Sequence, residues 1–342
     1  MFYPQSLEKG YKIGVSAPSA GMSSVPDQAR LENGVKHFQE LGYPVILTEH
    51  VRSDDRGASA SGKVRAEEMT ELILNPEVRA ILAAAGGDFL MQMLSELDLD
   101  LIRRNPKWLQ GFSDITGMLF TVTTNLDIAT IYANNFSSFG MQNWHSSLYE
   151  NVRILEGEDL VQHSYDFYQD GYKPRITGLE EFVPEAPVNW LGYTPDGKIT
   201  GDELMLSGRI LGGNLDVCLN LVGTRFDQVG HFIHKYREDG ILWFFESFSL
   251  DSSELIRGLW QLKEAGWFEY ASGFIFGRPA LFVEQNGIPY TDAIQVGLEK
   301  LQVPVILEAD IGHKPPQMTI MNGAMAKIRS CQGKGSIIFE RR

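Results

Sequence analysis

Apolar strands that alternate with helices in the first half of the chain constrain the fold more than any other feature. The expected strands cover residues 11–18, 43–50, 78–87, 107–112 and 129–135. The expected helices between them cover residues 27–42, 61–75, 88–97 and 114–126. Continuously apolar strands separated by helices are typical of a parallel sheet covered on both faces. We therefore expect an N-terminal α/β sandwich that binds ligands at the carboxyl ends of its strands.

The second half of the chain has a different pattern. Short strands dominate after residue 205, and one clear helix covers residues 251–268, with Asp251 or Ser252 as its cap. The segment before them is acidic, aromatic and rich in proline and glycine. We expect an N-terminal α/β domain over residues 1–160 and a linker over residues 161–200. A strand-rich, barrel-like α/β domain is expected over residues 201–342.

Composition excludes several classes of function. The formal net charge is −14, which disfavours binding to nucleic acid. The two cysteines, Cys218 and Cys331, have no CxxC spacing, so neither a disulfide framework nor a cysteine-based zinc site is expected. No signal peptide and no membrane-spanning run are visible, so a cytoplasmic location is expected. Dinucleotide and P-loop fingerprints are missing, and no cofactor or metal is expected.

The stretch GFSDITG, residues 111–117, contains the first candidate for chemistry. Ser113 lies between an apolar strand and a helix, as a nucleophile does on a sharp strand-to-helix turn. The glycine that usually follows such a serine by two positions is absent. On this stretch alone, a serine that caps the helix remains the stronger interpretation.

Three other places could cooperate with Ser113. Gly86 and Gly87 follow an apolar strand and could present backbone N–H groups to an anion, or simply form a tight turn. Glu246 ends the strand GILWFFESF, where an acid must be paired, either with a histidine or in a structural salt bridge. His313 follows the strand VPVILEADIG and suits a general base, although a plain loop histidine is as good an interpretation. The chain order Ser, Glu, His is one that serine hydrolases use.

Longer motifs show a family resemblance from about residue 11 to residue 328. They are GVSAPS, ILAAAGGD, GFSDIT, RILGGNLDVCLNLVGT, FFES, GLWQLKEAGWF, GFIFGRP and IGHKPPQMTIMNGAMA, in this order. The set resembles the LD-carboxypeptidase family of serine peptidases, which includes murein tetrapeptide carboxypeptidases and microcin self-immunity proteins. The length and the GGNL…GT block are more similar to the second, MccF-like branch. The resemblance implies an α/β sandwich with a strand-rich second domain, no cofactor and a homodimer.

The resemblance also implies roles for individual residues. Ser113 matches the family nucleophile, His313 its base and Glu246 the acid that orients the base. The backbone amides of Gly86, Gly87 and Asp114 match the oxyanion hole. The only mapping left open is Trp190 in APVNWLGY, which either stacks on the adenine of a substrate or packs the linker onto a domain.

These roles predict a serine-type amide hydrolase that acts through an acyl-enzyme. The expected substrate is a small peptide or a peptidyl- or aminoacyl-nucleotide of the microcin C type. A murein tetrapeptide that loses its terminal D-alanine is the alternative within the enzyme class. A non-catalytic protein that binds cell-wall fragments is the alternative from another class, and a dehydrogenase is a weaker one.

Overall fold

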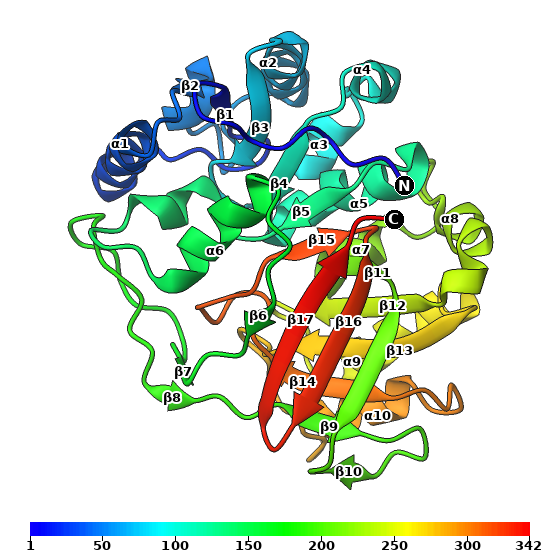
Figure 1. Ribbon diagram of the computed structural model, residues 1–342. Coiled ribbons are helices and arrows are strands. Elements are labelled where there is room, and N and C mark those ends of the chain that lie inside the picture. The colour runs from blue at the N-terminus through cyan, green and yellow to red at the C-terminus, as the bar shows by residue number, and fades with distance from the viewer. The chain divides into compact units, whose positions relative to one another are not determined.

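The chain folds into two compact units in the structure, a computed structural model that describes residues 1–342. The first unit consists of Met1–Glu158 and Lys173–Phe182, and the second of Asp159–Tyr172 and Val183–Arg342. Each unit has strands and a buried core of its own (Figure 1). The domain boundaries expected at residues 160 and 200 stay a prediction.

The first unit is built around a parallel sheet with the strand order β5-β4-β3-β1-β2. Its strands are β1 (Lys12–Ser16), β2 (Val45–Leu47), β3 (Val78–Ala83), β4 (Trp108–Gly111) and β5 (Thr130–Tyr132). Its helices are α1 (Val25–Glu40), α2 (Gly62–Leu74), α3 (Leu90–Leu94), α4 (Leu99–Arg104), α5 (Thr116–Leu126) and α6 (Ser146–Leu155). Single 3-10 turns are η1 (Glu49–Arg52), η2 (Ser113–Ile115) and η3 (Phe136–Gly140). The parallel α/β architecture expected from the sequence is confirmed.

The strand order of the first unit determines where its ligand site can lie. The chain moves from β1 outward to β2 and then returns to β3 on the other side of β1. Right-handed crossovers therefore place α1 on one face of the sheet and α2 to α5 on the other. Packing agrees, because α2, α3, α4 and α5 contact one another while α1 packs against η3. The crevice beyond the carboxyl ends of β1 and β3 is the switch point at which such sheets bind ligands.

The second unit contains a mixed sheet with the strand order β10-β9-β14-β13-β12-β11-β16-β17-β6. The central strands β11 (Leu204–Asn214), β12 (Ile241–Glu246), β13 (Ala271–Gly277) and β14 (Val305–Ala309) are parallel. The flanking strands are β6 (Gln162–His163), β9 (Leu191–Tyr193), β10 (Ile199–Thr200), β16 (Met325–Cys331) and β17 (Lys334–Glu340). The short strands β7 (Phe167–Tyr168) and β8 (Ala186–Pro187) pair with each other, and β15 (Ile320–Asn322) is another short strand of this unit. This unit is rich in strands, as expected.

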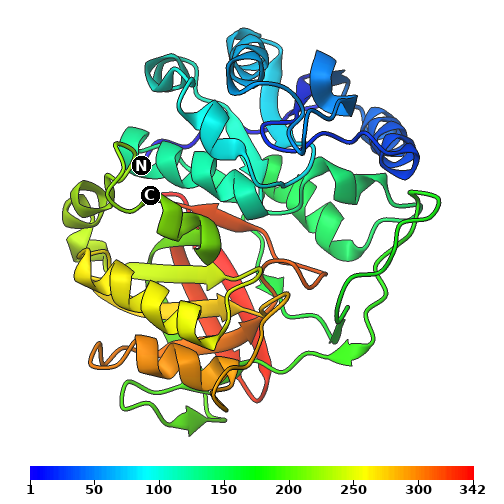
Figure 2. The same ribbon diagram turned by 180° about the vertical axis from the view of Figure 1, so that it is seen from behind.

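The helices of the second unit connect its parallel strands. They are α7 (Leu215–Leu221), α8 (Val229–Lys235), α9 (Ser252–Glu264) and α10 (Tyr290–Gly297), with the 3-10 turn η4 (Arg237–Asp239). The yellow α9 and the orange α10 lie side by side (Figure 2). Asp251 begins α9 with a capping box that also involves Glu254. No helix of the chain is long and apolar enough to cross a bilayer.

Some local predictions need correction. The helix expected over residues 88–97 is shorter, because α3 covers only Leu90–Leu94. A second helix that was not predicted, α4, follows it and is capped by the side chain of Asp98. Helices α6, α7, α8 and α10 were not predicted either, and each is only seven to ten residues long. Helix α1 matches its expected position, and Gly42, with a φ of +91°, follows its end.

Candidate active site

Ser113 lies on a sharp turn at the carboxyl end of β4. Its φ is +66°, a left-handed conformation that is uncommon for a residue other than glycine. The N-cap positions of η2 and α5 are Phe112 and Ile115, and neither makes a side-chain capping bond. The backbone geometry therefore resembles a strained strand–serine–helix turn more than an ordinary helix cap.

The Gly86–Gly87 loop lies against this turn. A Cβ on Gly86 would stand 3.1 Å from both Cβ and Oγ of Ser113. Gly87 has a φ of +144°, and a Cβ there would approach the hydroxyl of Ser19 to 2.4 Å. Gly87 therefore requires glycine because of its backbone conformation and this contact, while a side chain at Gly86 would press on Ser113.

The carboxylate of Asp114 links the turn to two neighbouring segments. Its Oδ2 accepts hydrogen bonds from the hydroxyl of Ser19 at 2.5 Å and from the backbone N–H of Leu90 at 2.8 Å. The Ser19 hydroxyl in turn accepts the N–H of Phe89 at 3.2 Å. Burial raises the pKa of Asp114, although these hydrogen bonds oppose the shift. Sequence reasoning used only the backbone amide of Asp114 and missed this role of its side chain.

Arg65 supports the same segments from α2. Its guanidinium is completely buried and donates to the carbonyl oxygens of Pro18 at 2.7 Å and Phe89 at 3.0 Å, and to the side chain of Gln92 at 2.9 Å. Burial lowers the pKa of Arg65, and the charge of Asp114 opposes that shift. A buried cation and a buried acid therefore fix the two loops at the carboxyl ends of β1 and β3.

In the second unit, Glu246 and His313 form a buried pair. Nδ1 of His313 lies 2.7 Å from Oε2 of Glu246, whose side chain is fully buried at the end of β12. The other oxygen of Glu246 accepts a hydrogen bond from Nδ2 of Asn214 at 2.8 Å. An acid with both oxygens occupied holds an imidazole in one orientation and leaves Nε2 for other contacts.

Strand register explains why Asn214 reaches Glu246. The two residues are paired across the parallel strands β11 and β12 and end those strands together. Oδ1 of Asn214 also caps α7 by accepting the N–H of Val217. Sequence reasoning missed Asn214, although its place after two glycines and before a helix was a visible capping signal.

The loop that carries His313 is fixed by a second buried cluster. Asp310 accepts hydrogen bonds from Arg278 at 2.6 Å and from the indole N–H of Trp190 at 3.1 Å. Gly312 has a φ of +95°, and a Cβ there would stand 2.6 Å from Cγ of Glu246. Burial raises the pKa of Asp310, while the charge of Arg278 opposes the shift.

Trp190 lies inside the second unit. Only 2 % of its surface is exposed, and its ring covers Gly335, where a Cβ would approach the indole to 2.1 Å. This placement favours the packing interpretation of Trp190 over stacking on a substrate.

One aromatic ring lies beside His313, and a second ring lies beside the first. The ring of Phe248 is 4.8 Å from the imidazole, and the ring of Tyr172 is 6.2 Å from that of Phe248. Tyr172 is 60 % exposed. Neither ring was singled out from the sequence, because nothing in the local pattern connects residue 172 with residue 313. No three His, Cys, Asp or Glu side chains gather as a metal site would require.

Comparison with known families accounts for both units. Residues 13–133 match the LD-carboxypeptidase N-terminal domain, and residues 207–328 match the LD-carboxypeptidase C-terminal domain. The chain belongs to the LD-carboxypeptidase family. It is therefore a hydrolase of the serine carboxypeptidase type. The resemblance noted in the sequence is confirmed.

Individual relatives are similar over nearly the whole chain. The Escherichia coli protein "Microcin C7 self-immunity protein MccF" is 26% identical over 94% of this chain and 91% of its own length. The Bacillus subtilis protein "Probable murein peptide carboxypeptidase" is 25% identical over 97% of this chain and 92% of its own length. The structure of MccF in complex with aspartyl sulfamoyl adenosine covers 100% of this chain and 99% of its own, with a TM-score of 0.82 and 24% identity. The last similarity supports the MccF-like fold.

Proposed function

We propose that the protein cleaves an amide bond by nucleophilic catalysis, with Ser113 as nucleophile, His313 as base and Glu246 as the acid that orients it. The buried Glu246–His313 pair, with its 2.7 Å contact, carries this proposal. A carboxylate without access to water is costly unless it is paired. Here it accepts from both an imidazole and an amide, which is how a catalytic histidine is oriented.

The proposed reaction begins at Ser113. Nε2 of His313 accepts the hydroxyl proton while Oγ attacks the substrate carbonyl carbon, and the charge that develops on the carbonyl oxygen is stabilised by backbone N–H groups. We assign these N–H groups to Gly86, Gly87 and Asp114. His313 then returns the proton to the leaving amine as the C–N bond breaks, which leaves an acyl group on Ser113. Water, deprotonated by His313, attacks this ester. The bond between the acyl carbon and Oγ of Ser113 then breaks, Oγ takes the proton back from His313, and the acid product is released.

For the substrate, we favour a peptidyl- or aminoacyl-nucleotide. MccF is similar to this chain over its whole length and binds aspartyl sulfamoyl adenosine. The exposed Tyr172 contacts Phe248, which contacts His313, and its ring offers a flat surface for a planar base. This pair, rather than Trp190, is the candidate for contact with a base.

A murein tetrapeptide is the second candidate. A relative of similar identity is named a murein peptide carboxypeptidase, and this substrate needs the same amide chemistry. It has no aromatic base, so Tyr172 would contribute little to its binding.

One experiment separates the two substrates. The protein is incubated in parallel with an aminoacyl-nucleotide amide of the microcin C type and with a murein tetrapeptide, and products are followed by mass spectrometry. We expect hydrolysis of the nucleotide substrate. This hydrolysis should be lost in Tyr172→Ala and unchanged in Tyr149→Ala, which removes another exposed tyrosine. Release of D-alanine from the tetrapeptide alone would reverse the assignment.

A non-catalytic role is tested by labelling. A fluorophosphonate probe reacts with an activated serine, so we expect mass addition at Ser113 that the variants Ser113→Ala and His313→Ala lack. Binding of both substrates without turnover or labelling would favour the protein that only binds cell-wall fragments.

A further inference from the structure

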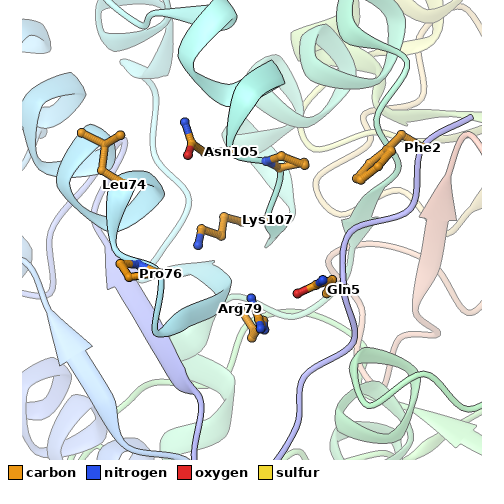
Figure 3. A pocket seen from close by; sticks show the side chains of 8 residues that line it. Phe2, Gln5, Leu74, Pro76, Arg79, Asn105 and Lys107 are labelled. Carbon is orange, nitrogen blue, oxygen red and sulfur yellow. The ribbon is translucent and has the colours of Figure 1, made fainter.

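A cavity of about 310 Å³ opens in the first unit, and none of the residues assigned to catalysis lines it. Phe2 and Leu74 line it together with two prolines, and Gln5, Arg79, Asn105 and Lys107 supply its polar groups (Figure 3). A volume near 300 Å³ is at the lower end of the ligand sites found in proteins, and half of the residues that line this one are polar or charged.

The strand register places this cavity at the amino ends of the parallel strands. Ala80 of β3 pairs with Trp108 of β4, so Arg79 and Lys107, one residue earlier, are neighbours at the start of these parallel strands. Ser113 follows the carboxyl end of β4. Within the first unit, the cavity therefore lies at the amino ends and the Ser113 turn at the carboxyl ends of strands in one sheet.

Lys107 presents a nearly buried positive charge to the cavity. Lys107 is only 8 % exposed. Its Nζ donates hydrogen bonds to the carbonyl oxygens of Asn75 at 2.8 Å and Val78 at 2.7 Å. An ammonium has three donors, so one remains. Burial lowers the pKa of Lys107, and the charge of Arg79 lowers it further. No acidic side chain of the protein pairs with Lys107.

Arg79 adds a second positive charge with free donors. Its guanidinium stacks on the ring of Tyr11, with Cζ 3.8 Å from the ring centroid, and has no hydrogen bond or ion pair within the protein. Stacking uses the face of the guanidinium and leaves the N–H edge available in its plane, in the fork that matches carboxylate or phosphate oxygens. Two adjacent unpaired cations are unexpected in a chain with a net charge of −14.

We propose that this cavity binds a small organic anion through a carboxylate or phosphate group. Arg79 donates two hydrogen bonds to the anion, the remaining donor of Lys107 provides a third, and an apolar part of the ligand packs on Phe2 and Leu74. The anion offsets the repulsion between Arg79 and Lys107, which the chain itself leaves uncompensated. The site shares no lining residue with the proposed catalytic residues and does not depend on their assignment.

Calorimetric titration of the full chain with three probes tests the proposal. Benzoate and phenyl phosphate carry the two candidate anions on a flat apolar ring, and benzamide is a neutral molecule of the same shape as benzoate. We expect saturable binding of at least one anion and none of benzamide, and the tighter anion identifies the preferred group. Equal binding of benzoate and benzamide, or no saturable binding of either anion at millimolar concentrations, would overturn the proposal.

Variants locate the binding in this cavity. Arg79→Gln should weaken binding of the tighter-binding anion by at least about tenfold, because a charge-assisted hydrogen bond contributes about 1.5–3 kcal/mol. Arg79→Lys keeps the charge without the fork and should retain part of the affinity. The control Arg103→Gln removes an exposed arginine that pairs with Asp100 and should change nothing. Unchanged affinity in a folded Arg79→Gln protein contradicts the site, and persistence of binding in Ser113→Ala keeps this result independent of the catalytic proposal.

Discussion

Ser113 combines a hydroxyl group with a backbone conformation that is unfavourable for serine. A hydroxyl is needed for attack, yet a φ of +66° is a conformation that glycine adopts more easily than serine. Strain of this kind persists where surrounding structure enforces it, and it is concentrated at functional sites. The contact of Gly86 with the Ser113 side chain and the hydrogen bonds of Asp114 are what enforce it here.

Two substitutions at Ser113 separate its chemical role from its strain. Ser113→Ala and Ser113→Gly both remove the hydroxyl, so both should lose almost all turnover. Only the glycine relieves the left-handed backbone, so Ser113→Gly should be more stable than Ser113→Ala by about 1 kcal/mol. Turnover by purified variants and urea unfolding provide the two measurements. Substantial activity in either variant would contradict Ser113 as the nucleophile.

Asp114 is expected to act as a positioning residue. Asp114→Ala leaves the hydroxyl of Ser19 and the N–H of Leu90 buried without an acceptor, at a cost of about 1–3 kcal/mol each. The Gly86–Gly87 loop should become more mobile, and kcat should fall by a larger factor than KM rises. Asp114→Asn keeps an acceptor oxygen and should restore most of kcat. Equal kcat loss in both variants would indicate that the charge of Asp114, rather than its geometry, is required.

The raised pKa of Asp114 predicts a pH dependence of stability. The folded state holds this proton more tightly than the unfolded chain does, whose aspartate has a pKa near 3.8. The stabilisation is therefore complete below that value and is lost as the pH rises through the higher pKa of the folded state. Asn cannot titrate, so the free energy of unfolding of wild type minus that of Asp114→Asn should fall as the pH rises through this interval. Urea unfolding at a series of acidic pH values measures the difference, and a rise would contradict the direction.

At the scale of elements, the site depends on loops that follow parallel strands. Glu246 and Asn214 reach each other because β11 and β12 end in register, and Gly312 allows the His313 loop to approach Glu246. The strand carries one residue of the pair and the loop carries the other, so the geometry of the loop decides whether Nδ1 meets the carboxylate.

Gly312→Ala tests this dependence. The added Cβ would stand 2.6 Å from Cγ of Glu246, so both the left-handed backbone and the contact oppose it. We expect lower stability and a reduced kcat, because Glu246 must move away from His313. Gly287→Ala is the matched control: its φ is +68°, but no atom lies within 4 Å of the added Cβ. It should cost about 1 kcal/mol of stability without affecting kcat. A Gly312→Ala protein with normal kcat would show that the His313–Glu246 contact tolerates displacement.

The sequence predicted the elements that depend on local pattern. Continuous apolar runs identified the strands of the first unit. Glu246 ends β12, while Ser113 and His313 lie in the segments that follow β4 and β14. Side-chain contacts between distant segments left no such signal. The carboxylate of Asp114 meets Ser19, 95 positions away, and Trp190 meets Asp310, 120 positions away. Periodicity reports which face of an element is buried, but it does not report which partner lies there.

At the scale of the whole molecule, charge is distributed unevenly. The chain carries 44 acidic and 30 basic residues, and the buried Arg209 and Arg278 pair with Asp239 and Asp310. Arg79 and Lys107 are neighbours without an acidic partner, and this motivates an anion site. A net charge of −14 disfavours capture of nucleic acid, so a small anion is the occupant that best fits this pair.

The two compact units also predict how the protein unfolds. Each contains a sheet and a buried core, with Leu119 in the first and Leu242 in the second, and chains with separate cores commonly depart from two-state unfolding. Differential scanning calorimetry should therefore resolve two transitions. Leu119→Ala should lower one of them by at least about 5 °C, and Leu242→Ala should lower the other, since each substitution leaves a cavity in one core. A single transition that both substitutions shift equally, with equal calorimetric and van't Hoff enthalpies, would show instead that the two cores unfold as one cooperative structure.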